Sequence, residues 1–465
     1  MSTKAGNWTP DTWRHFPMEQ AAPYPDEAAV SVAVERLKKL PPLVTSFEIE
    51  RLKDMIAEAQ RGERFVLQGG DCAETLIDCD STIISSKLKI LLQMSLVLLH
   101  ASKKPVVRIG RFAGQYAKPR SKPAEKGVLE NGEETSLPSY FGDLVNRPAF
   151  TLEDRQADPM LLIEAYKHAA LTLNFIRSLS DSGFADVHHP EYWDLRFMEG
   201  AKLSPGLRAE YENIVREVIS ALQFTRALGE KFIEEFTRVE FFASHEGLNL
   251  LYESAQTRTV PRREGWYDLT THLPWIGERT RGLEGAHVEF FRGIRNPVGV
   301  KIGPSASGDD VMALIDALNP DNEPGKLVLI TRFGATQVRA GLAPILNRVK
   351  REGRHVLWMS DPMHGNTQTT ASGVKTRHFG HILDEIAECF SAHEEAGTHL
   401  GGVHFELTGE DVTECTGGAD GLTEDDLHLN YATACDPRLN YRQALEMSFQ
   451  IARRMVQGEG SQKES

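Results

Sequence analysis

Four residues with metal-binding side chains lie in or after short apolar runs of the chain. Cys72 follows the run FVLQGG and His364 follows HVLWMSD. Glu406 lies inside GGVHFELTG, and Asp436 comes soon after it. A thiolate, an imidazole and two carboxylates could together bind one divalent ion, and the mixed set is compatible with manganese, iron, cobalt or zinc. Taken singly, each residue also has an ordinary structural explanation, although a carboxylate inside an apolar strand needs a partner.

A second set of residues is cationic and lies at the ends of similar runs. Lys301 is embedded in VGVKIG, where its ammonium group needs an anion to offset burial. Arginine binds carboxylate and phosphate groups in a bidentate manner. The set therefore predicts a site for one or two phosphorylated, carboxylated metabolites; the alternative is that several members form structural salt bridges with Asp143, Glu278 or Asp361. Its members are Arg108, Arg111, Lys118, Arg120, Arg279, Lys301 and Arg332.

The apolar runs that carry these residues have the character of buried parallel strands. Each run is short and rich in β-branched residues, and most are followed by a stretch with helical periodicity. Eight such runs favour a closed (β/α)8 TIM barrel, an α/β fold whose active sites form at the C-terminal ends of the strands. The runs are Phe65–Gly70, Val106–Arg111, Val239–His245, Asp268–Arg279, Val298–Gly303, Lys326–Arg332, His355–Asp361 and Gly401–Gly409.

The spacing of the runs predicts two additions to the barrel. Residues 1–60 precede the first run and are interpreted as an N-terminal extension, and residues 61–465 as the catalytic barrel. More than one crossover fits between the second and third runs, so we expect inserted helices at 160–179 and 206–236 within an insertion spanning about 121–238. The charged segment Ser121–Ser139 is predicted to be a mobile loop.

Composition excludes several classes of protein. The chain has 465 residues and a formal net charge of -14, which argues against a general nucleic-acid binder. Its five cysteines form no CxxC pair, so neither a disulfide scaffold nor a zinc ribbon is expected. The longest apolar stretch, residues 88–100, is too short to span a bilayer and predicts a buried helix. No signal peptide is visible, so we expect a cytoplasmic protein without membrane association.

Several histidines are interpreted as lying away from any site. His188, His189, His378 and His381 lie in polar, loop-like surroundings and are expected to be surface or helix-capping residues. His245 and Glu246 follow the third run and could line a site, without a role that the sequence specifies.

Ten longer motifs connect the chain with a known family. It resembles the type II (plant-like) 3-deoxy-D-arabino-heptulosonate 7-phosphate (DAHP) synthases, which open the shikimate pathway. The resemblance implies a transferase that condenses phosphoenolpyruvate with D-erythrose 4-phosphate and water, giving DAHP and phosphate. It also implies a barrel with an N-terminal extension and extra helices after the second strand. The motifs are WTPDTW, LQGGDCAET, RFAGQYAKPRS, LPSYFGD, ASHEGL, WIGERTR, NPVGVKIGP, DPMHGNT, TGEDVTEC and CDPRLN.

The resemblance also implies roles for individual residues. One divalent metal ion, Mn²⁺ or Co²⁺ with Fe²⁺ or Zn²⁺ as alternatives, is expected on Cys72, His364, Glu406 and Asp436. Phosphoenolpyruvate is expected on Arg111, Lys118, Glu278, Arg279, Lys301 and Arg332. Arg120 and Ser121 resemble the residues that bind the phosphate of erythrose 4-phosphate in the related type I enzymes, so the same role is expected for them here. Glu278 is a candidate to orient the attacking water, and Lys118 is a candidate proton donor.

Subunit contacts and a redox pair are further expectations. Barrel additions often form oligomer contacts, so a homodimer or homotetramer is expected, and a chorismate mutase is a candidate partner. Because Cys435 adjoins Asp436, a disulfide between Cys435 and Cys72 is a further hypothesis, with a buried thiol as the alternative. The competing functions are another metal-dependent aldolase or hydrolase on the same barrel, and a regulatory protein without activity.

Overall fold

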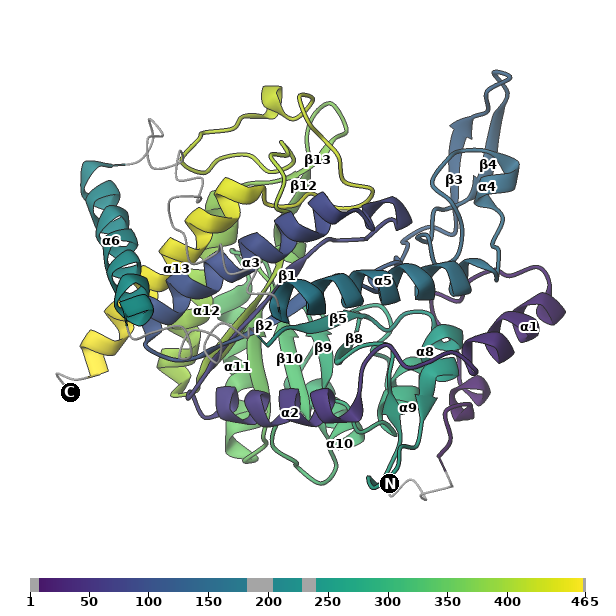
Figure 1. Cartoon of the computed structure of the whole chain (residues 1–465), viewed down its shortest axis with the longest axis horizontal. Helices are drawn as coiled ribbons and strands as arrows, with labels where there is room; N and C mark the ends of the chain where they lie inside the picture. Colours follow the sequence, from purple (N-terminus) through teal and green to yellow (C-terminus); the bar gives the residue numbers. More distant parts are fainter. Residues whose placement is uncertain (1–7, 182–203, 228–239, 463–465) are drawn as a thin grey trace.

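At the centre of the computed structural model, which describes residues 8–181, 204–227 and 240–462, eight parallel strands close into a barrel (Figure 1). The strands neighbour one another in chain order, and the first pairs with the last. Each of the eight predicted runs contributes one strand, which confirms the (β/α)8 fold. The strands are β1 (Phe65–Gly70), β2 (Val106–Arg111), β5 (Phe242–Glu246), β8 (Leu273–Ile276), β9 (Val298–Ile302), β10 (Leu327–Thr331), β11 (Leu357–Ser360) and β14 (Leu400–Glu406).

The register of β1 brings residues of three strands to one level at the C-terminal rim. Gly70 pairs with Arg111 of β2 on one side and with Glu406 of β14 on the other. Gly70 has a φ of +146°, and a Cβ atom there would lie 2.6 Å from the carbonyl oxygen of Arg111. Only glycine fits this close approach without moving the neighbouring backbone.

Within the described part of the chain, seven helices follow strands of the barrel and cover its outer face. Because one face of each strand packs inside the barrel and the other packs under a helix, the strands are almost entirely buried. This double burial explains why they are continuous apolar runs in the sequence. The helices are α3 (Ser81–Ser102), α8 (Leu250–Gln256), α9 (Ala286–Phe291), α10 (Gly308–Leu318), α11 (Val338–Arg351), α12 (Phe379–Ala396) and α13 (Tyr441–Gln462).

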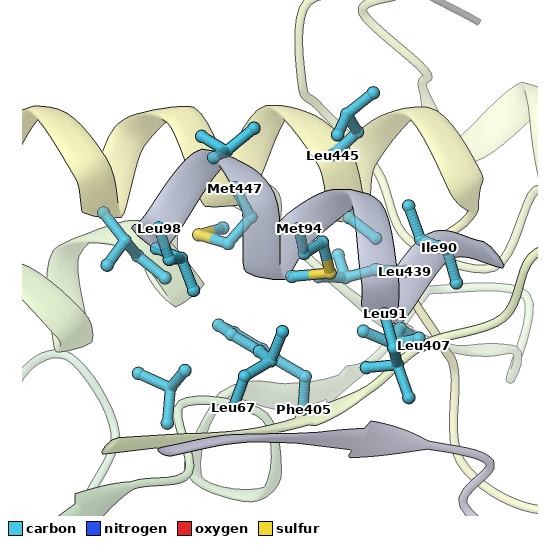
Figure 2. Close-up of a cluster of buried hydrophobic side chains, with 14 of the residues drawn as sticks. Leu67, Ile90, Leu91, Met94, Leu98, Phe405, Leu407, Leu439, Leu445 and Met447 are labelled. Atoms are coloured by element: carbon cyan, nitrogen blue, oxygen red, sulfur yellow. The ribbon is translucent and has the colours of Figure 1, made fainter. Parts of the chain in front are cut away.

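Helix α3 contains the longest apolar stretch of the chain and is a core helix, as predicted. It is long and apolar enough to cross a membrane by length and composition, and 61% of its apolar window is buried inside the protein. Figure 2 shows its residues Leu91, Met94 and Leu98 between α13 and the strands that carry Leu67 and Phe405. The apolar residues of α3 therefore pack against α13 on one side of the helix and against the barrel strands on the other.

Helix α2 (Ser46–Gln60) closes the N-terminal end of the barrel and lies across the lower ends of the strands in Figure 1. Thr45 and Glu48 form a capping box that starts the helix, with the Thr45 amide donating to Glu48 Oε2 at 2.8 Å. Leu52, Met55 and Ile56 then pack against side chains inside the barrel. Ahead of it lie η1 (Thr12–His15) and α1 (Glu27–Leu37).

The segment predicted to be a mobile loop after β2 is instead an antiparallel hairpin, so that prediction is wrong. Strands β3 (Ala124–Val128) and β4 (Glu134–Pro138) pair in register and project from the barrel in Figure 1. The turn between them is closed by the Leu129 amide, which donates to the carbonyl of Glu133 at 2.9 Å. The high charge of this segment reflects the exposed faces of a two-stranded ribbon and does not indicate missing structure.

Beyond the hairpin, the described part of the insertion contains three helices. They are α4 (Leu152–Arg155), α5 (Leu161–Asp181) and α6 (Pro205–Ala227), so both predicted inserted helices exist. The predicted helical residues 228–236, and also His188 and His189, lie outside the described residues. The remaining short elements are η2 (Leu76–Asp78), β6 (Thr257–Arg258), β7 (Tyr267–Asp268), η6 (His364–Asn366), β12 (Thr367–Thr369), β13 (Lys375–Arg377) and η7 (Glu424–Asp426).

Candidate active site

One cavity of about 400 Å³ at the C-terminal rim of the barrel collects every residue to which the family resemblance assigned a role. The residues come from the C-terminal ends of seven of the eight barrel strands and from the loops that follow them, where barrel enzymes carry their chemistry. The predicted members of its lining are Cys72, Arg111, Lys118, Arg120, Ser121, Glu278, Arg279, Lys301, Arg332, His364, Glu406 and Asp436.

The four predicted metal-binding residues lie in two overlapping groups of donor atoms in this cavity, which share Asp436. Cys72 Sγ lies 3.8 Å from Asp436 Oδ2, and His364 Nε2 lies 3.1 Å from Glu406 Oε1. The donor atoms of His364, Glu406 and Asp436 all lie within 4.8 Å of one another. Metal–ligand bonds of about 2.0–2.3 Å place neighbouring donors about 3–4 Å apart, so the spacing and the chemistry of this set fit one divalent ion.

His364 is held by two carboxylates. Its Nδ1 atom lies 2.7 Å from Asp361 Oδ2, while Nε2 faces Glu406 across the cavity floor. Burial alone would lower the pKa of His364, but Asp361 and Glu406 raise it. A carboxylate on one ring nitrogen fixes the orientation of the ring and leaves the other nitrogen for a metal, the arrangement typical of metal-binding histidines.

Glu406 is fully buried and has cations on two sides. Arg111 Nη2 donates to its Oε1 atom at 3.1 Å, and Arg377 Nη1 lies 2.6 Å from Oε2. Burial would raise the pKa of Glu406, whereas His364, Arg377 and Arg111 together hold it well below its usual range. The partner that a carboxylate in a barrel strand requires is thus a pair of arginines.

Two thiols meet at the same cluster. Cys72 Sγ and Cys435 Sγ are 2.9 Å apart, and both cysteines are free. Burial raises the pKa of Cys72 well above its usual value, and the hydrogen bond with Cys435 adds to this effect. Metal binding to Cys72 would therefore release a proton.

The segment that carries Cys435 and Asp436 is fixed by buried charges. Arg438 donates to Asp71 Oδ1 at 2.6 Å and to Glu414 Oε1 at 2.8 Å. Asp71 also forms an ion pair with Lys87 of α3. These contacts tie the end of β1 to the segment after β14.

Two of the cationic residues that line the cavity contain an N–H group without a protein partner among the described residues. The Nε atoms of Arg111 and Arg332 are buried and have no hydrogen-bond partner among the described residues. Arg111 also stacks over the Trp275 ring, 5.2 Å from its centre. Buried guanidinium groups with free donors are suited to bind a carboxylate or phosphate.

Lys301 forms a salt bridge with Asp361, as in the structural alternative given above for the cationic set. Burial lowers the pKa of Lys301 to about 8, although Asp361 acts in the opposite direction. Glu278 accepts from Arg281 at 3.0 Å, and its Oε2 atom has no hydrogen-bond partner among the described residues. Asp143 instead accepts from the Tyr140 hydroxyl and the Leu76 amide.

The loop that carries Lys118 and Arg120 is organised by a buried carboxylate that the sequence analysis did not identify. Glu74 accepts hydrogen bonds from the amides of Ala113, Gly114 and Gln115 at 2.7–2.9 Å. Lys118 Nζ then lies 3.5 Å from the carbonyl oxygen of Ala434.

Arg108 and His245 lie outside the cavity, although the sequence placed both near it. Arg108 belongs to the predicted cationic set, but it donates to Ser95 of α3 at 2.7 Å and is absent from the cavity lining. It alternates with inward-facing residues of β2 and so points outward. Glu246 lines the cavity, whereas His245 is held by Glu253 at 2.9 Å behind it. His378 caps α12, as expected, by accepting from the Gly380 amide.

Several residues of the cavity were missed by sequence reasoning. Trp275 is an inward-facing residue of β8 and could have been found from the alternation of that strand. Thr367 and Lys375 line the cavity from the β12–β13 hairpin, which also carries Arg377 behind Glu406, and Lys375 Nζ lies 2.7 Å from Asp436 Oδ1. The Ser-Gly turn between two short β-prone runs was the available signal for this hairpin.

Fold and site together define a (β/α)8-barrel protein that combines a metal-type donor cluster with a cationic anion site in one rim cavity. The profile of the class-II DAHP synthetase family matches residues 8–452. The chain belongs to this family and is an enzyme of the transferase class.

Three relatives illustrate the similarity, and each is named phospho-2-dehydro-3-deoxyheptonate aldolase. The Neurospora crassa protein is 46% identical over 464 residues, covering 96% of this chain and 94% of the relative. The Streptomyces coelicolor protein is 46% identical over 451 residues, covering 97% of each chain. The Mycolicibacterium smegmatis protein is 41% identical over 475 residues, covering 96% of this chain and 99% of the relative.

Proposed function

We propose that the protein is a metal-dependent DAHP synthase of the shikimate pathway that joins phosphoenolpyruvate to erythrose 4-phosphate. The observation that carries the proposal is the meeting of the donor cluster and the cationic residues in one cavity of a class-II DAHP synthetase family member. In the overall reaction, the methylene carbon of phosphoenolpyruvate forms a bond with the aldehyde carbon. Water adds to the adjacent carbon of the former enol ester, and inorganic phosphate leaves with the ester oxygen.

The residues that would hold the metal ion are Cys72, His364, Glu406 and Asp436. Their donor atoms converge, and two of the four residues already have partners behind them that fix their orientation: Asp361 behind His364, and the two arginines behind Glu406. A divalent ion there would supply Lewis acidity to the aldehyde carbonyl and stabilise negative charge on its oxygen. Mn²⁺ or Co²⁺ is our first expectation, with Fe²⁺ or Zn²⁺ as alternatives.

Phosphoenolpyruvate would lie over the cationic residues. Arg111 and Arg332 have free buried N–H donors, and Lys301 can exchange its Asp361 partner for a substrate anion. Arg279 is exposed at the rim and adds a further positive charge. Holding the methylene carbon opposite the aldehyde can lower the barrier by roughly 7–11 kcal/mol.

The remaining roles concern the second substrate and the protons. Arg120 and Ser121 line the cavity beside Lys118 and would bind the phosphate of erythrose 4-phosphate. Glu278 has a free carboxylate oxygen with which to orient the attacking water. Lys118 is only 7% exposed, so its ammonium group is shielded from bulk solvent and placed to donate a proton.

A phosphate-release assay with both substrates, with and without a chelator, tests the proposal. We expect release that requires both substrates, stops with the chelator and returns on addition of Mn²⁺ or Co²⁺. Turnover of an aldehyde substrate without phosphoenolpyruvate would instead support the alternative of another metal-dependent aldolase or hydrolase.

We also propose that the protein acts as a cytoplasmic homodimer or homotetramer, with a chorismate mutase as a candidate partner. The additions to the barrel, α1, α5 and the β3–β4 hairpin, offer surface beyond the catalytic core. Light scattering during size-exclusion chromatography tests the oligomer, and a single-chain mass would refute it.

A further inference from the structure

A buried carboxylate on α12 connects the two loops that carry an anion-binding arginine and a metal-type histidine. Glu385 is 0% exposed and lies outside the cavity lining. Its Oε1 atom accepts from the amides of Phe333 at 2.9 Å and Gly334 at 3.0 Å. Both amides belong to the loop after β10, directly beyond Arg332.

The other oxygen of Glu385 reaches the loop after β11. Asn366 Nδ2 donates to Glu385 Oε2 at 2.7 Å, and Asn366 Oδ1 accepts from the Ala335 amide at 3.1 Å. Asn366 lies two residues beyond His364 and also donates to the carbonyl of Pro362 at 2.8 Å. Glu385 and Asn366 thus form a bridge between the two loops.

The loops that this bridge joins are in direct contact. A Cβ atom on Gly365 would lie 2.3 Å from the Gly334 amide nitrogen, so their backbones touch. Arg332 Nη2 donates to the carbonyl of His364 at 3.1 Å. The two loops therefore pack directly against each other.

The charge of Glu385 matters to the bridge. All three of its hydrogen bonds come from uncharged N–H groups, and an ionised carboxylate accepts such bonds more strongly than a neutral group does. Burial raises the pKa of Glu385 to about 7, and these three hydrogen bonds act against that rise. A glutamine in its place would keep an acceptor for the two backbone amides but would turn its own NH₂ group toward the NH₂ group of Asn366. Rotating the Asn366 amide would relieve that clash only by leaving the Ala335 amide without its acceptor.

We propose that Glu385 is a positioning residue that holds the Arg332 and His364 loops as one unit, so that the anion site and the metal-type donors keep a fixed separation. The inference rests on the proposed function for the roles of Arg332 and His364. The proposal adds a residue of α12, on the outer face of the barrel, that acts on the anion site and on the metal-type donors together.

The test uses Glu385→Gln, with Glu388→Gln as the matched control. Glu388 lies on the same helix, its side chain is 37% exposed, and it pairs weakly with Arg339 at 3.5 Å. Co²⁺ affinity is measured from the absorption of the metal-free enzyme titrated with Co²⁺, and phosphoenolpyruvate affinity by calorimetry without metal. We expect E385Q to weaken both by roughly 10-fold or more, within the range of 10–100-fold for outer-shell changes, and E388Q to leave both within about twofold.

A rescue variant separates positioning from general destabilisation. In the double variant E385Q/N366D, the carboxylate introduced at position 366 accepts from the side-chain amide introduced at position 385 and from the Ala335 backbone amide. The contact between positions 366 and 385 is thereby restored with its polarity reversed, while the Pro362 carbonyl loses its donor, so we expect both affinities to recover in part and to exceed those of E385Q. A thermal midpoint that falls while both affinities stay within twofold of wild type would overturn the proposal, since it would show a structural role alone.

The proposal stays testable if E385Q does not fold, and its failure can be told apart from failure of the proposed function. If E385Q does not fold, Asn366→Ala keeps the Glu385 charge and cuts the bridge, and unchanged Co²⁺ affinity in N366A would overturn the proposal. Failure of the proposed function is distinguishable because it would appear in the wild-type enzyme, as absence of Co²⁺ or phosphoenolpyruvate binding before any substitution is made.

Discussion

Cys72 Sγ and Cys435 Sγ lie 2.9 Å apart at the floor of the cavity, although 363 residues separate them in the chain. This proximity supports the sequence-based hypothesis of a disulfide between them. Burial, the largest influence, raises the pKa of Cys435, but the hydrogen bond with Cys72 and the charge of Lys118 act in the opposite direction, and the pKa is lowered overall, which favours a thiolate. The neighbouring thiols therefore combine a nucleophile with a reachable partner.

We predict that mild oxidation forms this disulfide and inactivates the enzyme. Oxidation would remove the Cys72 thiolate from the donor cluster, so activity should fall and two free thiols per chain should disappear. Dithiothreitol should restore both. The variant Cys435→Ser should keep its activity under the same oxidant, and an unchanged thiol count in the wild-type enzyme would end the hypothesis.

Replacing Lys118 with methionine should reduce turnover. The substitution removes the ammonium group and keeps the volume of a side chain that is 7% exposed, so folding should be preserved. Loss of a general acid typically costs about 10²–10⁴-fold in rate. Steady-state kinetics measure the effect, and a Lys118→Met enzyme with normal kcat would exclude Lys118 from the chemistry.

Replacing Glu406 with alanine should destabilise the fold itself. The change leaves the buried guanidinium groups of Arg111 and Arg377 without the anion between them, and breaking a buried ion pair costs about 3–5 kcal/mol. Urea denaturation of the metal-free protein measures the loss. As a control, Glu35→Ala removes an exposed partner of Lys38 and should cost less than about 1 kcal/mol; equal losses in the two variants would contradict the prediction.

Binding of phosphoenolpyruvate should weaken as the pH rises through about 8. Burial lowers the pKa of Lys301 to about 8, so above that pH the side chain loses its proton and its attraction for an anion. Calorimetric titrations across this range, without metal, would follow the effect. Lys301→Arg retains its charge at these pH values and should give a flat profile, whereas a flat profile for the wild type would show that Lys301 stays charged.

The strands and the rim residues could be predicted because their signals are local. A strand buried on both faces is a continuous apolar run, and a residue such as Arg111 or Arg332 at the end of such a run must lie at the rim of a barrel. The sequence-based predictions failed where an apolar run did not reveal the structure. The exposed β3–β4 hairpin has a polar sequence, and Arg108 lies within β2 on the face that points away from the cavity.

The sequence by itself determined the number of barrel strands, the end of the barrel that holds the chemistry and the identity of its principal charged residues. It could not determine which groups touch, because contacts such as Cys72 with Cys435 or Glu406 with Arg377 depend on closure of the barrel. Tertiary structure alone decided that Lys301 forms a salt bridge with Asp361 and that Glu385 joins the loops after β10 and β11. These relationships arise between residues distant in sequence, where periodicity and propensity carry no information about distance.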